Sequence, residues 1–579
     1  MFDLVIRGGT VVDGTGAPAA PADVAVKDGR IVEVRPGIDG EAAVTIDASG
    51  RVLTPGFVDI HTHYDGQVTW DSLLEPSSGH GVTTLVAGNC GVGFAPVHPG
   101  SEEWLVQLME GVEDIPGTAL HEGITWGWES FPQYLDLLDS RRWSVDVAAY
   151  VAHGPVRAYV MGQRGARNEE ATPEDVAAMS RIVREAVEAG AMGFSTSRTT
   201  AHRARDGEPV PGTFATRAEL NGLAQGLLDA GGGVFEIAPQ GLEFEPAVMR
   251  TELDWILDLA RDTGLATSFL LMQSSVKPRF YRETLDRVSE ANATGARVIP
   301  QVAGRPFGMM LGWASYHPFG LRPTYRSLAA SLPHNELLAE LRKPAVRAAI
   351  LAEADQAPDP TVRFDGIPLL FHNSWGNIFE MGAVPDYEPT VDHALDKLAA
   401  DRGVSPQELA YDLMNELNGG SFLMLPFFNY VDGNHDAIRE MLLHDSTVSG
   451  LSDGGAHCRM ICDASMPTYM LTHWARDRWR GPKLTLEQAV KLQTSDTAAV
   501  VGLGDRGVIA PGKRADLNVI DFERLTLGFP TAADDLPAGG RRLVQGASGY
   551  DATIVAGVVT RRFGIDTGAR PGRLVRRAG

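Results

Sequence analysis

Two histidines at alternate positions are the first residues of this chain whose types and spacing suggest chemistry. His61 and His63 end the apolar run FVDIHTH (residues 57–63), which is typical of a buried β-strand. Side chains at positions i and i+2 of a strand point to the same face and lie about 6 to 7 Å apart. Two imidazoles so placed can hold one divalent metal ion. The pair taken alone favours two hydrogen-bonded core histidines, and its context at the start of the βα pattern favours the metal.

A cysteine among glycines is a second candidate ligand. Cys90 follows the apolar run 84–87 and lies among Gly88, Gly91 and Gly93. Glycines at these positions let the backbone approach a ligand closely, and a thiolate is a natural ligand of zinc. The local pattern alone favours a buried, unreactive cysteine.

The elements that must position these side chains alternate between strands and helices from about residue 55 onward. Helical stretches such as 173–188 and 217–229 separate short apolar runs, which is the pattern of a parallel sheet. We therefore predict an α/β fold with a (β/α)8 TIM-type barrel, in which functional groups lie at the carboxyl ends of the strands. The predicted strands are 56–63, 83–87, 145–152, 191–196, 233–237, 267–272, 297–302 and 448–453.

Both ends of the chain consist of short strands separated by turns, such as the turn KDGR at 27–30. We predict that residues 1–54 and 501–579 together form a small β-sandwich domain, with the barrel domain at 55–500 between them. The stretch 303–445 is too long for a single connection. It is expected to form helical insertions over the barrel mouth, where substrate loops would lie.

Composition narrows the class of protein. The 579 residues carry a formal net charge of -23, which disfavours binding to nucleic acid or to anionic membranes. Three cysteines in a chain of this length indicate a reducing cytoplasm rather than a disulfide framework. The first residues lack the pattern of a signal peptide, and no apolar run is long enough to span a membrane. A small-molecule substrate is the expected partner, and a homo-oligomer is compatible with the sequence.

Longer motifs carry a family resemblance. The segments LTPGFVDIHTH (53–63) and GVIAPGKRADL (507–517) resemble signatures of the amidohydrolase superfamily. Within it, GNCG (88–91), GAMGFST (190–196) and DTGARPGRL (566–574) resemble the D-aminoacylases, which are N-acyl-D-amino-acid deacylases. The likeness runs from the first strand almost to the last residue and is weakest between about 300 and 445.

The resemblance implies a metal, with zinc expected, held by His61, His63 and an aspartate on strand eight. That aspartate matches Asp453, and the matching family cysteine, also a metal ligand, is Cys90. From the residues alone, Asp453 follows an apolar run and precedes two glycines, at the place where such barrels carry catalytic groups. An aspartate before glycine is also common in turns.

The chain departs from the family pattern on strands five and six. Glu236 stands where a histidine is expected on strand five, and strand six has neither a histidine nor the lysine that usually follows it. Two interpretations are open. In one, Cys90 and Glu236 complete a single rearranged metal site, and in the other, a second metal site of the family is lost. One zinc ion is expected, and a second one stays open. A carboxylate can replace imidazole on zinc. The alternative for Glu236 is an interior acid paired with Arg198.

Three further side chains follow predicted barrel strands and are expected to bind substrate. They are His153 after strand three, Arg198 after strand four and His457 after Asp453. Each also fits a structural polar group.

The expected activity is metal-assisted hydrolysis of a carbon–nitrogen bond, other than a peptide bond, in a small N-acyl compound. The leading substrate class is an N-acyl-D-amino acid, with Asp453 acting first as general base and then as general acid. No phosphate-binding loop and no serine nucleophile elbow is present. The missing histidines leave a cyclic imide, a lactone or an aromatic amide as alternative substrates. A barrel that binds a small molecule without hydrolysing it is the alternative of a different class.

Overall fold

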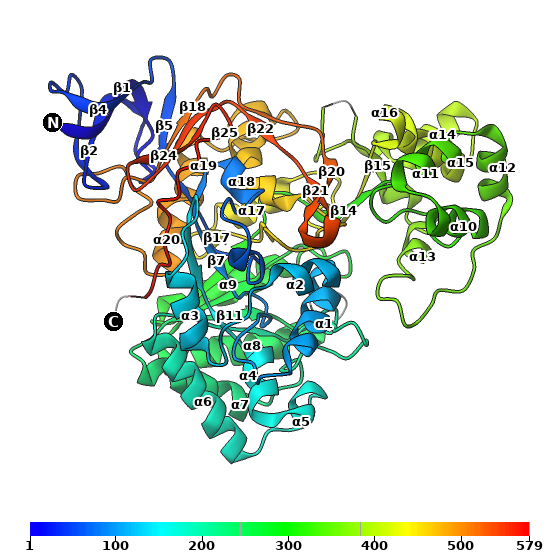
Figure 1. Cartoon of the computed structure of the whole chain (residues 1–579), viewed down its shortest axis with the longest axis horizontal. Coiled ribbons are helices and arrows are strands. Elements are labelled where there is room, and N and C mark those ends of the chain that lie inside the picture. The colour runs from blue at the N-terminus through cyan, green and yellow to red at the C-terminus, as the bar shows by residue number, and fades with distance from the viewer. Residues whose placement is uncertain (242–245, 383, 578–579) are drawn as a thin grey trace.

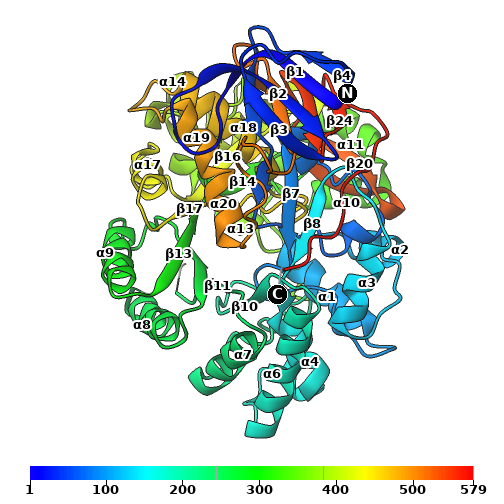
Figure 2. The ribbon, with the colours of Figure 1, turned by 90° about the vertical axis from the view of Figure 1, so that its left-hand side faces the viewer.

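A computed structural model describes residues 1–241, 246–382 and 384–577, in which parallel strands alternate with helices in an α/β fold (Figures 1 and 2). All eight predicted parallel strands are present, with ends that differ from the predicted ones by a few residues. They are β6 (Phe57–Asp59), β7 (Val82–Ala87), β8 with β9 (Asp146–Ala149 and Val151–Ala152), β10 (Gly193–Ser197), β11 (Val234–Ala238), β12 (Ala266–Leu270), β13 (Arg297–Val302) and β17 (Val448–Ser449). Among the helices of these ranges, none has the length and apolar character that crossing a membrane requires.

These strands are hydrogen-bonded in sequence order. They form two parallel sheets, β6-β7-β8 and β9-β10-β11-β12-β13-β17. Only Tyr150 separates β8 from β9, so one stretch of chain contributes to both sheets. A parallel bridge joins Thr62, which follows β6, to Gly454, which follows β17. The first and last strands are therefore neighbours, as a (β/α)8 arrangement requires.

Capping residues explain where the outer helices begin. Thr172 accepts a hydrogen bond from the backbone of Asp175 and starts α6 (Pro173–Glu188), and Thr216 caps α7 (Arg217–Asp229) in the same way. Figure 2 shows α8 (Pro246–Thr263) and α9 (Phe280–Ala293) outside β13. Further helices along the chain are α17 (Asp436–Leu442), α19 (Leu486–Leu492) and α20 (Ser495–Val500).

Strands from the two ends of the chain lie in one nine-stranded sheet (Figure 1). The ends meet where β5 (Val52–Pro55) pairs antiparallel with β18 (Leu517–Ile520). The predicted β-sandwich differs from this arrangement, because β1 (Phe2–Val11) pairs with β4 (Ala42–Asp47) along its first half and with β5 at its end. One continuous sheet results. Its other strands are β2 (Ala20–Lys27), β3 (Arg30–Arg35), β23 (Tyr550–Val555), β24 (Val558–Arg562) and β25 (Ile565–Asp566).

The C-terminal segment belongs only partly to this sheet. Residues 526–548 form two separate strand pairs, and the backbone N–H of Leu543 donates to the carbonyl oxygen of Cys458, in the loop after β17. The last residues bridge to Trp143 and Val147 beside β8. Residues 501–579, predicted to belong to one domain, thus contact both the nine-stranded sheet and the parallel strands. The two pairs are β19 (Thr526–Leu527) with β22 (Ala547–Ser548), and β20 (Thr531–Leu536) with β21 (Gly540–Val544).

The stretch between β13 and β17 has a hydrophobic core of its own. Its helices stand to one side of the parallel strands (Figure 1), and Tyr316 and Arg363 contact Asp114 and Gly111 at the end of α1 (Glu102–Glu113). A three-stranded sheet, absent from the prediction, joins the helices to the rest of the chain. The elements are β14 (Phe307–Leu311), α10 (Pro323–Ser331), α11 (His334–Leu341), α12 (Pro344–Ala352), α13 (Pro368–Phe371), β15 (Phe379–Glu380), α14 (Leu395–Arg402), α15 (Pro406–Met414), α16 (Glu416–Gly419) and β16 (Leu423–Phe428).

Candidate metal centre

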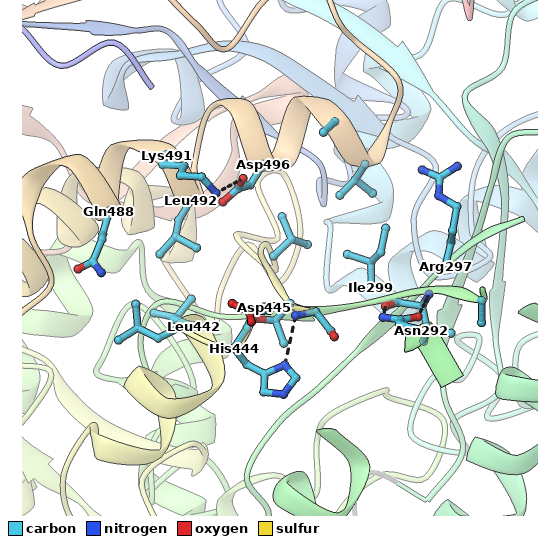
Figure 3. A pocket seen from close by; sticks show the side chains of 18 residues that line it. Asn292, Arg297, Ile299, Leu442, His444, Asp445, Gln488, Lys491, Leu492 and Asp496 are labelled. Atoms are coloured by element: carbon cyan, nitrogen blue, oxygen red, sulfur yellow. Dashed lines mark hydrogen bonds and ion pairs between the residues drawn. The ribbon is translucent and has the colours of Figure 1, made fainter. Parts of the chain in front are cut away.

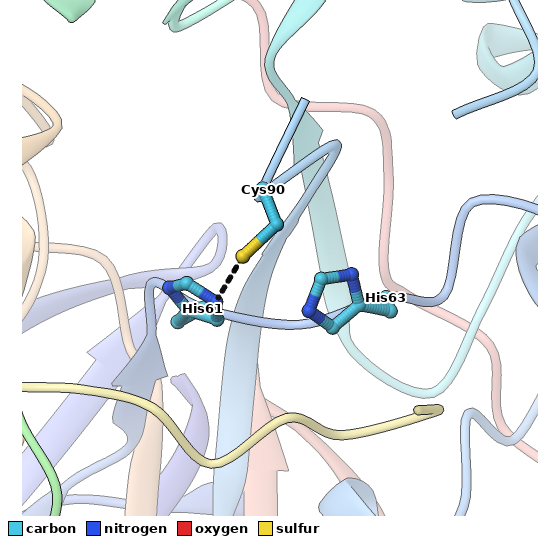
Figure 4. Close-up of side chains that lie close together, drawn as sticks. All are labelled: His61, His63 and Cys90. Carbon is cyan, nitrogen blue, oxygen red and sulfur yellow. Dashed lines mark hydrogen bonds between the residues drawn. The ribbon is translucent and has the colours of Figure 1, made fainter. Parts of the chain in front are cut away.

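His61, His63 and Cys90 each bring one ligand atom to within 4.8 Å of the others (Figure 4). Both histidines follow β6, and Cys90 follows the neighbouring parallel strand β7. The Cys90 sulfur lies 3.4 Å from Nε2 of His61, and all three side chains are buried. The three predicted ligands therefore meet at the carboxyl ends of adjacent strands.

Two glycines fix the position of Cys90. A Cβ on Gly88 would lie 2.3 Å from the carbonyl oxygen of Tyr150, and one on Gly91 would lie 2.6 Å from the backbone nitrogen of Ser197. Both glycines also have positive φ, at 83° and 69°. Because only glycine fits at these two places, the loop packs tightly against its neighbouring strands and holds the thiol over the strand ends.

Asp453 joins the cluster from the last parallel strand. Its backbone N–H donates to the carbonyl oxygen of His61 at 3.2 Å, and the N–H of His63 donates to Gly454 at 2.8 Å. These bonds tie the segment after β17 to the segment after β6. The Asp453 Oδ1 atom lies 3.4 Å from Nε2 of His61 and 3.6 Å from Nε2 of His63. The carboxylate therefore lies beside Nε2 of both histidines, and the Cys90 sulfur lies beside Nε2 of His61.

Gln301, which the sequence did not single out, orients His61. Its Oε1 lies 3.0 Å from Nδ1 of His61, and its Nε2 donates to Ser268 at 3.1 Å. Because a carbonyl oxygen only accepts, Nδ1 carries the hydrogen and the lone pair of Nε2 points to the cluster. Ser268 lies on strand β12, where the family histidine is missing.

Glu236 lies on strand β11 beside the cluster. The backbone N–H of Cys90 donates to its Oε2 at 3.1 Å, while Oε1 lies 4.0 Å from Nδ1 of His61. The alternative partner Arg198 is not available, since its Nε donates to Glu252 at 3.1 Å. Glu236 is therefore a buried acid directed at the candidate ligands.

Two residues predicted to bind substrate have structural partners instead. Both ring nitrogens of His153 are engaged, Nδ1 with Thr196 at 2.8 Å and Nε2 with Glu219 at 3.0 Å. The guanidinium of Arg198 also donates to the carbonyls of residues 212, 213 and 215. These side chains hold α7 and the loop before it in place, and their role in substrate binding stays a prediction.

Glu113 is a second residue that the sequence did not reveal. It ends α1 (Glu102–Glu113), and its Oε1 lies 3.3 Å from Nδ1 of His63. Its other oxygen lies 3.6 Å from Nε2 of His457, the predicted substrate residue, which the structure does bring to the cluster. No local motif marks Glu113, because its contacts depend on how α1 folds back over the strand ends.

Burial sets the protonation of the cluster. It lowers the pKa of His61 to about 4 and that of His63 to about 3, so both rings are neutral, as metal ligation requires. Burial raises the pKa of Glu236 to about 8 and, with nearby acids, raises the pKa of the Cys90 thiol and of Glu113. Because these buried acidic groups lie close together, they favour the binding of a cation that neutralises their charge.

Polar atoms without partners gather at the same place. The buried atoms Nδ1 of His63, Oε1 of Glu113, Oε1 of Glu236, Oδ2 of Asp65 and Nδ1 of His457 have no hydrogen-bond partner. Buried polar groups in proteins are normally paired. Together with the nitrogen, sulfur and oxygen donors present, these atoms show that the residues fit a divalent metal ion such as zinc.

Two other places in the described ranges fit a catalytic metal less well. Glu388, His435 and His473 converge, but Arg478 donates to both oxygens of Glu388, at 3.1 and 2.9 Å, and already neutralises it. A cleft of about 620 Å³ is lined by Arg297 and by residues 442–448, at the amino ends of β13 and β17 (Figure 3). It therefore lies at the opposite end of the strands from the metal ligands.

The chain matches the amidohydrolase family over residues 44–561 and belongs to that family. A D-aminoacylase of Alcaligenes xylosoxydans xylosoxydans is 29% identical, over 90% of this chain and 88% of that protein. A D-aminoacylase structure described by its binuclear metal center, with one-metal activation and second-metal attenuation, is 25% identical, covers both chains fully and has a TM-score of 0.65. The same identity, coverage and score hold for N-acyl-D-glutamate deacylase from Bordetella bronchiseptica, complexed with zinc and a phosphonate inhibitor.

Proposed function

We propose that this chain is a zinc-dependent hydrolase of N-acyl-D-amino acids, built on a closed (β/α)8 barrel. The observation that carries the proposal is the convergence of His61, His63, Cys90 and Asp453 at the carboxyl ends of three parallel strands. Family membership and the named activities of the relatives support the reaction class. A cytoplasmic location is part of the proposal, because three free buried cysteines suit a reducing compartment.

The metal ligands proposed are His61, His63, Cys90 and Asp453, with Glu236 as a further carboxylate. One zinc per chain is proposed, because strand six carries no histidine that could hold a second ion. Zinc held by these residues would lower the pKa of a water molecule and polarise a carbonyl group. Gln301 would hold His61 in the required orientation, and Glu113 lies 3.3 Å from Nδ1 of His63.

Asp453 is the proposed proton carrier. Its Oδ1 faces both ligand histidines, and its position on a loop tied to β6 holds that atom in place. As general base, Asp453 would take a proton from the attacking water. As general acid, it would then give that proton to the leaving nitrogen, so that the amine departs neutral.

Turnover of matched substrates tests the proposal. N-acetyl-D-amino acids should be hydrolysed faster than their L-forms and faster than cyclic imides, lactones or aromatic amides.

Asp453→Asn should lower kcat by about 10²- to 10⁴-fold, since it removes the proton carrier. Asp445→Asn, at the other end of the same strand (Figure 3), is the matched control and should keep the wild-type rate. Near-normal turnover by Asp453→Asn, or preference for an imide, would overturn this assignment.

A further inference from the structure

A second cleft lies at the amino ends of the parallel strands, at the opposite end of these strands from the candidate metal ligands. Its volume is about 560 Å³, and it is lined by Val234, Ala266 and Arg297, which are the first residues of β11, β12 and β13. Arg576 and Arg577, near the end of the chain, form another part of its wall. The metal ligands follow the carboxyl ends of β6, β7 and β17, so this cleft is a separate place in the molecule.

Arginines dominate the charge of this cleft. Its charged lining residues are four arginines and one aspartate, Asp505, although the whole chain has a formal net charge of -23. Asp505 lies 2.9 Å from Nε of Arg506 and is therefore neutralised. Arg506 is in turn paired with Asp146 at 2.7 Å. The other three arginines carry the positive charge that remains.

Two of these three arginines have no acidic partner within the described ranges. The side chain of Arg297 forms neither a hydrogen bond nor an ion pair there. Arg577 donates only to carbonyl oxygens, of Ala230 at 3.3 Å and of Gly231 at 2.5 Å. Arg576 differs from both, because it is paired with Asp136 at 2.9 Å. A cleft lined mainly by one sign of charge raises the local concentration of ions of the opposite sign.

Arg297 stands where this cleft meets the cleft of about 620 Å³, since it lines both. Neither acid of that neighbouring cleft neutralises it. Asp496 is paired with Lys491 at 2.6 Å, and Asp445 forms no ion pair with Arg297 (Figure 3). The positive charge of Arg297 is therefore available to a ligand.

Bonds to the backbone hold Arg577 in place. Its own N–H donates to the carbonyl oxygen of Gly190 at 2.9 Å, and its guanidinium reaches the carbonyls of residues 230 and 231. These acceptors precede β10 and β11, so the side chain is fixed at the strand ends. A guanidinium has five N–H donors, and the two carbonyl oxygens leave the others for a further acceptor.

We propose that this second cleft, the arginine cleft, binds a small molecule that carries two anionic groups, phosphate or carboxylate. Arg297 would hold one group and Arg577 the other. The planar fork of an arginine matches either group through two parallel hydrogen bonds. The volume of the arginine cleft is typical of small-molecule sites. The bound molecule is distinct from the hydrolysed substrate, so this assignment does not depend on the proposed function.

Calorimetric titration of the zinc-loaded wild type tests the arginine cleft. The probes are fructose 1,6-bisphosphate and glutarate, and each is compared with a molecule that has one anionic group fewer, fructose 6-phosphate and butyrate. At least one probe should bind once per chain and at least about tenfold more tightly than its comparator, because it makes a second charge-assisted contact. The probe that binds identifies phosphate or carboxylate as the ligand chemistry, and binding of both shows that the cleft accepts either.

Variants locate the binding. Arg297→Met and Arg577→Met should each remove the preference for the probe over its comparator. Arg181→Met, on an exposed position of α6, removes the same charge elsewhere and should leave the affinity unchanged. The His61→Ala/His63→Ala variant should bind the probe like the wild type, since the metal ligands lie at the other end of the strands.

Four results would overturn the arginine cleft as a binding site. They are binding of neither probe, equal binding of each probe and its comparator, an unchanged affinity in Arg297→Met or in Arg577→Met, and loss of binding in the double histidine variant.

Discussion

Single hydrogen bonds decide whether the ligands at this centre point to one place. Gln301→Leu removes the acceptor that orients His61 and should lower the affinity for zinc by about 10- to 100-fold, as for other groups that support metal ligands. Competition with a chromophoric chelator measures this affinity. Gln273→Leu, a glutamine that bonds to Asp432, is the control and should bind zinc normally. An unchanged affinity in Gln301→Leu would show that Gln301 does not orient the ligand.

The pKa shifts predict the direction of the pH dependence of zinc binding. The pKa of Glu236 is raised to about 8 and that of the Cys90 thiol is raised as well, so zinc must displace protons from both groups. Apparent affinity should therefore fall with falling pH over the whole range because of the thiol, and more steeply below about 8, where Glu236 also takes up a proton. His61, with a pKa of about 4, and His63, with about 3, compete with zinc only in strong acid. Affinities measured from pH 5 to 9 check this, and Glu236→Gln should flatten the slope.

Some residues of the metal centre could be predicted from the sequence, and others could not because their contacts form only in the folded chain. His61, His63, Cys90 and Asp453 lie in short motifs at strand ends, so their neighbours in sequence predict their role. Glu113 and Gln301 act through contacts that only folding creates, such as the pair of Gln301 with His61, 240 positions apart. His153 has the same sequence context as a ligand, yet two protein partners occupy it.

At the scale of elements, α7 is fixed by a buried ion pair. Arg157 and Glu219 lie 2.8 Å apart and are each 1% exposed, with His153 on the same carboxylate. Glu219→Gln leaves the arginine charge buried and should lower the free energy of unfolding by about 3 kcal/mol. Denaturant unfolding measures the change, and zinc content should not alter.

The exposed pair of Arg184 and Glu188 on α6 provides the control for this prediction. Glu188→Gln should change the free energy of unfolding by less than about 0.5 kcal/mol. If Glu219→Gln impaired substrate binding at unchanged stability, His153 would have the substrate role that its contacts argue against.

The parallel strands could be predicted because they are short apolar runs that alternate with helical stretches, of which α6 and α7 begin at capping threonines. The sheet of β14, β15 and β16 could not, since its strands are separated by long helical segments and pair only through the fold. The continuous sheet of β1 to β5 has the same explanation, because one strand exchanges partners along its length.

At the scale of the whole molecule, the insertion is joined to the end of α1 through Asp114. Tyr316→Phe removes one hydrogen bond to that carboxylate, which contributes about 1.5 to 3 kcal/mol. The rate at which a protease cleaves residues 353–367 should therefore rise at least about tenfold. Tyr325→Phe, in the same insertion, should behave like the wild type. Equal sensitivity of the two variants would show that the insertion is held elsewhere.

The central claim is that the ligands at the strand ends bind zinc, and metal content tests it most directly. Elemental mass spectrometry should find about one zinc per chain in the wild type purified without added metal. The His61→Ala/His63→Ala variant should contain none, with a far-ultraviolet circular dichroism spectrum like that of the wild type. A wild type that binds no zinc even after reconstitution, or a double variant that retains it, would contradict the account.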